Sequence, residues 1–234
     1  PAGDLVLGVW YHIVTTVSGT TMRSYINGAL QGEKTDGWEP NTIARSNCYV
    51  GKPNWVSEGH LNGAVASLKI YSGAMTQAEV TAAYGSFTSA PTSAPTQAPS
   101  AAPSAAPSAA PSAAPSAAPT QVPTSAPTQS PIALALNFDW DFKNAATNTI
   151  VDSVGGIVAT LTNADGTGRT ATGIALDGTN DHLVLDFSST QLGGPMTIEV
   201  VGKWVAFNSY SPLFDCGNAG GDNSDIDIFN VGTS

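Results

Sequence analysis

The stretch "LGVWYHIVTTVSGTTMRSYINGALQG" (residues 7–32) decides the fold class of this chain. Residues 9–17 are dense in β-branched and aromatic side chains, which predicts a strand. Ser18 and Gly19 predict a turn, and residues 20–26 run back as a second strand. Asn27-Gly28 follows at once and is the strongest two-residue hairpin signal. The stretch therefore predicts antiparallel β-structure and reads like the interior of a domain, with little sequence before it.

The rest of residues 1–86 continues this pattern. Residues 47–52 and 60–72 predict two more strands, with Gly63 as a candidate bulge. A short helix follows, because Thr76 and Glu79 have the spacing of a capping box. The side chains expected to face the sheet from this helix are Val80, Ala83 and Tyr84. Gly85 stands where a C-terminal cap is expected.

Residues 87–131 have a different composition. A proline falls at every fourth position from Pro91 to Pro131, separated by Ala, Ser, Thr, Gln and one Val. Such a segment has nothing from which to build a core. The prolines predict an extended polyproline II linker, and the Ser and Thr residues beside them suit O-glycosylation.

Residues 132–234 again predict an all-β unit. The candidate strands are short and are separated by turns rich in Gly, Asn and Asp, which is typical of a sandwich. They span residues 134–142, 155–163, 173–178, 182–187 and 196–204.

The charge distribution excludes some function classes. The net charge is −10, and almost all of it lies in residues 132–234, whereas the linker carries none. This balance disfavours nucleic-acid binding. No apolar run approaches the roughly 20 residues that span a bilayer.

Several motifs resemble laminin-G-like domains of the concanavalin A-like lectin/glucanase superfamily. In residues 1–86 they are Trp10 with His12, the "YING" hairpin at 25–28, and "LKIYSGAMT" at 68–76 before the helix. In residues 132–234 they are "GIALDGTNDHLVLDF" and the segment from Gly193 onward. The resemblance implies jelly-roll sandwich material on both sides of the linker, as in large secreted modular proteins of algae.

The order of the two parts is unusual. Residues 1–86 resemble the C-terminal part of such a sandwich, and residues 132–234 resemble the N-terminal part of a second one. Two explanations stay open. Either the chain is a window cut from a tandem array of such units, or the halves complement each other between chains, as a homo-oligomer or a fibre.

A catalytic site is not predicted. "SDIDIFN" (224–230) resembles the "EIDIFE" strand of the glucanase branch, whose retaining hydrolysis needs two carboxyl groups. Asp225 stands at the first position, but Asn230 stands at the last and cannot donate and regain a proton. His12, His60 and His182 show no metal-binding spacing. We therefore expect no enzyme.

Two kinds of ligand site are predicted. Exposed loop tryptophans beside polar groups suit sugar stacking, which indicates Trp38, Glu39, Asn54 and Trp55 as glycan-binding candidates. Loops rich in carboxylates and amides suit calcium. The candidate calcium ligands are Asp177, Asn180, Asp181, Asp222, Asn223 and Asp225.

Cys48 and Cys216 are the two cysteines of the chain. The sequence leaves open whether they are buried thiols or a disulfide, within or between chains. The function that the sequence favours is a non-catalytic, extracellular modular protein of a cell surface or wall, in which the sandwich recognises glycans or matrix proteins. The alternatives are a structural fibre subunit and the binding module or remnant of a glucanase.

Overall fold

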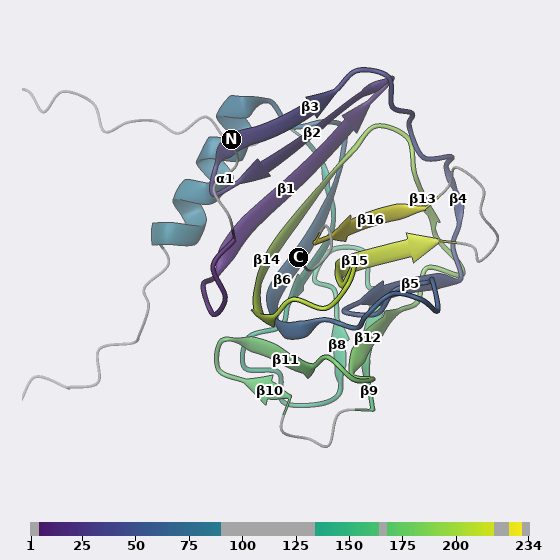
Figure 1. Ribbon diagram of the computed structural model, residues 1–234. Coiled ribbons are helices and arrows are strands. Elements are labelled where there is room, and N and C mark those ends of the chain that lie inside the picture. Colours follow the sequence, from purple (N-terminus) through teal and green to yellow (C-terminus); the bar gives the residue numbers. More distant parts are fainter. Residues whose placement is uncertain (1–4, 90–133, 164–167, 218–224, 231–234) are drawn as a thin grey trace, which may run out of the picture.

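The computed structural model describes residues 5–89, 134–163, 168–217 and 225–230. The chain forms a sandwich of two main β-sheets, with one helix on the outer face of the larger sheet (Figure 1). The all-β prediction is confirmed. The predicted proline-rich linker lies outside the described residues.

The larger sheet has eight strands in the order β10-β11-β6-β14-β1-β2-β3, with β7 also paired to β6. Its strands are β1 (Tyr11–Ser18), β2 (Thr21–Ile26), β3 (Ala29–Lys34), β6 (Asn62–Ser72), β7 (Leu136–Asp141), β10 (Arg169–Thr170), β11 (Gly173–Asp177) and β14 (Met196–Ala206).

The smaller sheet has six strands in the order β16-β15-β5-β12-β9-β8. Its strands are β5 (Asn47–Val50), β8 (Thr149–Val151), β9 (Val158–Thr162), β12 (His182–Leu185), β15 (Pro212–Gly217) and β16 (Ile226–Phe229). A further small sheet pairs β4 (Ile43–Ala44) with β13 (Gln191–Leu192).

Strands from the two sides of the linker alternate within both main sheets. In the larger sheet, β14 lies between β1 and β6 and pairs with each along most of its length. In the smaller sheet, β5 lies between β12 and β15. The two segments thus complete one sandwich within a single chain, whereas their assignment to parts of two different repeats stays a prediction.

The core lies between the two sheets and draws on both segments. Side chains alternate along the strands, as a half-buried sheet requires. In β14, for example, Ile198 and Val200 face the core, while Thr197 and Glu199 face the helix side. Trp140 and Trp204 are buried in this core.

The helix α1 (Gln77–Ser89) begins at the predicted capping box. The Glu79 N–H donates to the Thr76 hydroxyl at 3.3 Å, and the Thr76 N–H donates to the Glu79 carboxylate at 2.8 Å. Val80 and Ala83 are buried against the sheet. The predicted cap at Gly85 is wrong, because the helix continues to Ser89 through this residue.

Three local predictions also need correction. The first hairpin turn consists of Gly19 and Thr20, one residue later than predicted, because Ser18 still pairs with Thr21. The predicted strand from residue 155 begins only at Val158, because residues 153–155 form a turn. Trp10 stands in a strand-like run, for which a core position is expected, but it precedes β1 and is half-buried, with the Lys203 amine 5.0 Å from its ring centre.

Candidate functional site

The strand β16 organises the candidate site. Ile226 and Ile228 face the core, so Asp227 and Phe229 lie on the opposite face. β16 pairs with β15, which places Asp215 directly opposite Asp227. Two carboxylates thereby come together on the outer face of the smaller sheet.

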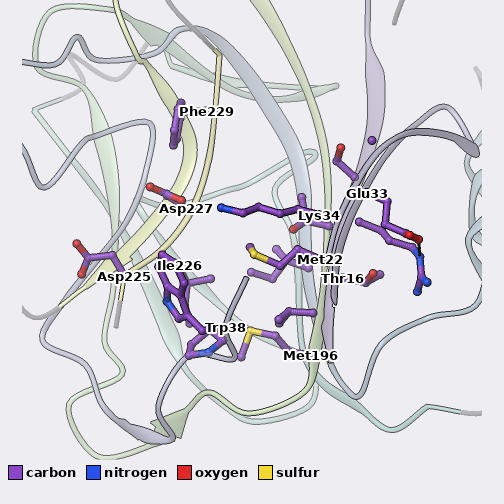
Figure 2. A pocket seen from close by; sticks show the side chains of 17 residues that line it. Thr16, Met22, Glu33, Lys34, Trp38, Met196, Asp225, Ile226, Asp227 and Phe229 are labelled. Carbon is purple, nitrogen blue, oxygen red and sulfur yellow. Dashed lines mark hydrogen bonds and ion pairs between the residues drawn. The ribbon is translucent and has the colours of Figure 1, made fainter. Parts of the chain in front are cut away.

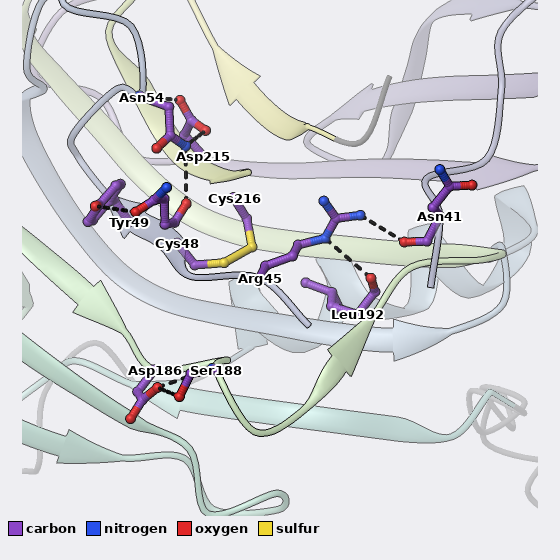
Figure 3. Close-up of a disulfide and its surroundings, with 11 residues drawn as sticks. Asn41, Arg45, Cys48, Tyr49, Asn54, Asp186, Ser188, Leu192, Asp215 and Cys216 are labelled. Carbon is purple, nitrogen blue, oxygen red and sulfur yellow. Dashed lines mark hydrogen bonds between the residues drawn. A yellow bond between two sulfur atoms is a disulfide. The ribbon is translucent and has the colours of Figure 1, made fainter. Parts of the chain in front are cut away.

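Asn54 holds the Asp215 side chain in place. The Asn54 N–H donates to one carboxylate oxygen of Asp215 at 2.8 Å, and the Asn54 amide side chain donates to the other (Figure 3). Burial raises the pKa of Asp215, while these two hydrogen bonds act against the rise. The pair therefore forms a rigid polar group between the loop after β5 and strand β15.

Asp227 and Glu58 complete an acidic cluster around this pair. Loss of solvation, followed by the charges of Asp215, Asp225 and Glu58, raises the pKa of Asp227 to about 6. Loss of solvation and the charge of Asp215 also raise the pKa of Glu58. We call Asn54, Glu58, Asp215 and Asp227 together the carboxylate face.

Exposed aromatic rings border the carboxylate face. The rings of Tyr210 and Phe229 lie 5.8 Å apart, and each side chain is about two-fifths exposed. Trp55 is 49% exposed and lies one residue after Asn54. The Gly59 N–H donates to the Ser209 carbonyl at 2.8 Å, so the loops that carry Trp55 and Tyr210 are neighbours.

A cavity of about 690 Å³ lies along the edge of β16 that β15 does not occupy, between this strand and the inner face of β1, β2, β3 and β14 (Figure 2). Residues from both faces of β16 line it: Ile226 from the core face, and Asp227 and Phe229 from the outer face. Trp38 lines it and is 50% exposed, with the Lys34 amine 5.8 Å from its ring centre. Its apolar lining is Val17, Met22, Pro40, Met196, Ile198, Ile226 and Phe229.

The four predicted glycan residues fall into two groups. Asn54 and Trp55 lie at the carboxylate face. Trp38 lines the cavity, whereas Trp55 is not among the residues that line it. Glu39 accepts a hydrogen bond from the Gly19 N–H and so holds the first hairpin turn.

The six predicted calcium ligands are also divided. Asp177 accepts the N–H groups of Thr179 and Asn180, which lowers its pKa. Asp181 is buried in the same turn, whereas Asp225 lines the cavity. Asp222 and Asn223 lie outside the described residues. Within the described ranges, no group of three or more His, Cys, Asp and Glu side chains is placed to hold a metal ion.

Cys48 and Cys216 form a disulfide between β5 and β15 (Figure 3). They face each other across the antiparallel pair, 168 residues apart in sequence. The bond links the segment before the linker to the segment after it. It lies in the core directly behind Asp215 and fixes the strand that carries this residue.

Asn230 has a structural role in the loop after β16. Its amide oxygen accepts the Ser211 hydroxyl at 2.6 Å, and its amide nitrogen donates to the Asn208 carbonyl at 2.9 Å. Where the glucanase motif needs a second carboxylic acid, this chain therefore has a buried amide that ties two loops together.

His12 is buried as well. Its Nε2 lies 3.3 Å from the Glu199 carboxylate, and its ring contacts the rings of Tyr84 and Phe87 on α1. Glu199 also accepts the Tyr71 hydroxyl at 2.9 Å. This group lies on the helix side of the larger sheet, away from β16.

Sequence reasoning missed five residues of the site: Glu58, Asp215, Asp227, Tyr210 and Phe229. Asp215 and Glu58 carry no local motif, and they meet Asp227 only because β15 pairs with β16 and the loop after β5 folds over them. Tyr210 and Phe229 are single aromatic residues in polar surroundings. Only Phe229 has a usable sequence signal. Ile226 and Ile228 mark the core face of a strand, so the side chain of Phe229 is expected on the opposite, outer face.

Comparison with known proteins adds one finding. Residues 1–81 match the family model described as the concanavalin A-like lectin/glucanases superfamily. No curated protein and no solved structure matches the chain. Within the described residues, no helix is both long and apolar enough to cross a membrane. The match and the sandwich together are consistent with a binding module.

Proposed function

We propose that this chain is a non-catalytic recognition module of an extracellular modular protein, and that its carboxylate face binds glycans. The observation that carries the proposal is the meeting of Asp215, Asn54 and Asp227 beside three exposed aromatic rings. The rings belong to Trp55, Tyr210 and Phe229.

The chemistry of this face suits a sugar. The apolar C–H faces of sugars stack on aromatic rings, while their hydroxyl groups donate to carboxylates. Asp215 is only 4% exposed and both of its carboxylate oxygens accept hydrogen bonds from Asn54, so a sugar hydroxyl would donate to the exposed Asp227 carboxylate instead. Because the face is acidic, a neutral glycan is favoured over a uronic or sulfated one.

A binding role is favoured over hydrolysis. Asp215 and Asp227 lie opposite each other on neighbouring strands, but the Asp215 carboxylate already accepts two hydrogen bonds from Asn54. Asn230 cannot act as a general acid. We therefore favour a binding module over the remnant of a glucanase as the function of this chain.

The disulfide supports an extracellular location, because disulfides persist mainly in oxidising compartments. The proline-rich segment has many Ser and Thr residues, which suit O-glycosylation of an extracellular chain. We also propose that a calcium ion bound at the turn that carries Asp177 and Asp181 orders this loop of the module.

Binding to immobilised polysaccharides tests the proposal. We expect the folded chain to bind a neutral polymer among β-glucan, mannan and xylan, and to bind alginate and carrageenan more weakly. Trp55→Ala and Phe229→Ala should each weaken binding at least tenfold. Leu30→Ala is the matched control, because Leu30 is 48% exposed but belongs neither to the carboxylate face nor to the cavity lining, and it should leave binding unchanged.

Two results would contradict the proposal. A folded chain that binds none of these polymers would favour the purely structural fibre subunit. Release of reducing sugar from any β-glucan would favour the enzyme.

A further inference from the structure

The strand β16 forms one end of the smaller sheet. Within the described part of the chain, it pairs with β15 alone, so its second edge has no partner there. The backbone N–H and C=O groups along such an edge are ready to pair with another strand. Leaving them unpaired beside an apolar surface costs free energy.

The cavity lies next to this second edge. It is lined by β16 and by the inner face of the larger sheet, but by no residue of β15. Its volume of about 690 Å³ corresponds to roughly 20 water molecules at about 30 Å³ each. Water gains few hydrogen bonds from Met22, Met196 and Ile226, so apolar side chains would fill this space more favourably.

The geometry would suit one more strand in the smaller sheet. A strand laid along β16 would point alternate side chains into the cavity, toward Trp38 and Met22 (Figure 2). The other side chains would lie on the outer face, beside Asp227 and Phe229. An added strand would thus need apolar residues toward the cavity to alternate with polar or charged residues toward the outer face.

The outer residues of that strand would meet negative charge. Asp227, Asp215 and Glu58 lie together there. Loss of solvation raises the pKa of each, and the charges of neighbouring carboxylates add to the rise. Lys34 and Arg23 also line the cavity, but their ion pairs are with Asp36 at 3.9 Å and Glu33 at 2.6 Å. Lysine or arginine beside Asp227 would supply the missing positive charge.

We propose that β16 and the cavity beside it form a docking site for an extended strand of a partner polypeptide, in which apolar residues alternate with lysine or arginine. The strand extends the smaller sheet through backbone hydrogen bonds to β16. Its apolar side chains fill the cavity, and its basic side chains contact the carboxylates. This recognition mode is β-strand addition, and it does not depend on glycan binding.

A synthetic peptide tests the site directly. The probe is fluorescein-labelled Lys-Val-Lys-Leu-Lys-Val-Lys, and the readout is fluorescence anisotropy against the full chain. A scrambled peptide, Lys-Lys-Lys-Lys-Val-Leu-Val, has the same composition and charge without the alternation. We expect at least tenfold weaker binding of the scrambled peptide, and equal binding of the two would overturn the proposal.

Backbone methylation separates strand addition from simple charge attraction. Successive residues of a strand direct their N–H groups to opposite edges. We prepare one peptide N-methylated at Val and Leu and another N-methylated at the inner lysines. Only one of the two should lose binding, by at least tenfold, whereas equal binding or equal loss would overturn the proposal.

Two matched variants locate the site on the protein. Met22 is 41% exposed and lines the cavity, whereas Leu30 is 48% exposed and does not. Met22→Arg should abolish peptide binding, and Leu30→Arg should preserve it. If the chain instead forms dimers that Met22→Arg dissociates, the occupant is a second copy, and the basic partner is refuted.

Discussion

Replacing Asp227 by Asn should stabilise the protein at neutral pH and have no effect in acid. The pKa of Asp227 is raised from an ordinary value near 3.8 to about 6, so its carboxylate is disfavoured in the folded state. Below about pH 3 the group is protonated in both the folded and the unfolded state. Folding therefore loses stability as the pH rises from about 4 through 6.

The magnitude follows from the size of this shift. A shift of about two pKa units, at about 1.4 kcal/mol for each unit, sets an upper limit near 3 kcal/mol. Because the side chain is exposed at the edge of the sheet, solvent screening reduces this to about 1 kcal/mol. We expect Asp227→Asn to raise the free energy of unfolding by about that much at pH 7.5.

Urea unfolding of both proteins at pH 3 and pH 7.5 measures the difference. Asp186→Asn is the matched control, because the Ser188 N–H and hydroxyl donate to Asp186 and lower its pKa. This control should not stabilise the protein at pH 7.5. If Asp227→Asn is neutral or destabilising there, the carboxylate cluster is not under electrostatic repulsion, and the reasoning fails.

Three further predictions concern the sandwich itself. Replacing Cys48 and Cys216 by Ser should lower the free energy of unfolding by about 2–5 kcal/mol in urea titration, and a smaller change would mean that the disulfide does not hold the segments together. Gly63→Ala should cost about 1–3 kcal/mol in thermal unfolding, because a Cβ at Gly63 would lie 2.1 Å from the Lys203 carbonyl oxygen. Gly32→Ala, whose Cβ meets nothing closer than 3.7 Å, should show no steric cost, and equal effects of the two would refute the steric argument. Thr76→Ala should cost about 1 kcal/mol through loss of the helix cap, with rescue by Thr76→Ser; no loss in urea titration would exclude the cap as a source of stability.

The strands that the sequence predicts are those with a strong local signal. β1 and β2 have β-branched and aromatic residues, and the Asn27-Gly28 turn joins β2 to β3. By contrast, β3 is exposed at every residue except the half-buried Gln31 and shows no alternation. It forms because the turn and the backbone pairing with β2 hold it in place, and such pairing leaves no mark in the local sequence.

The sequence does not predict β15 either, but for the opposite reason: β3 is too exposed to show an apolar pattern, whereas β15 is too buried. All six of its residues are buried, so the apolar alternation that indicates a half-buried strand is absent. Its first and last residues, Pro212 and Gly217, are of types that are common in loops. Pro212 is tolerated because it is the first residue of the strand.

The candidate site is predictable only in part. Sequence composition indicates Asn54 and Trp55 as polar and aromatic loop residues, but Asp215 is 161 residues away from Asn54 and meets it only in the folded sandwich. The cavity beside β16 depends on the relative position of two sheets, which no local pattern encodes. The placement of Trp38 in the cavity and of Trp55 outside it also depends on how the two sheets pack, and no local pattern predicts it.

The central claim is that the segments on the two sides of the linker complete one sandwich within a single chain. Refolding an equal mixture of ¹⁴N- and ¹⁵N-labelled chains, followed by non-reducing peptide mapping of the monomer fraction, tests it directly. The account predicts Cys48–Cys216 crosslinked peptides in which both halves carry the same label. Crosslinked peptides of mixed label, or a sample that folds only as a concentration-dependent oligomer, would contradict it and show that the halves pair between chains.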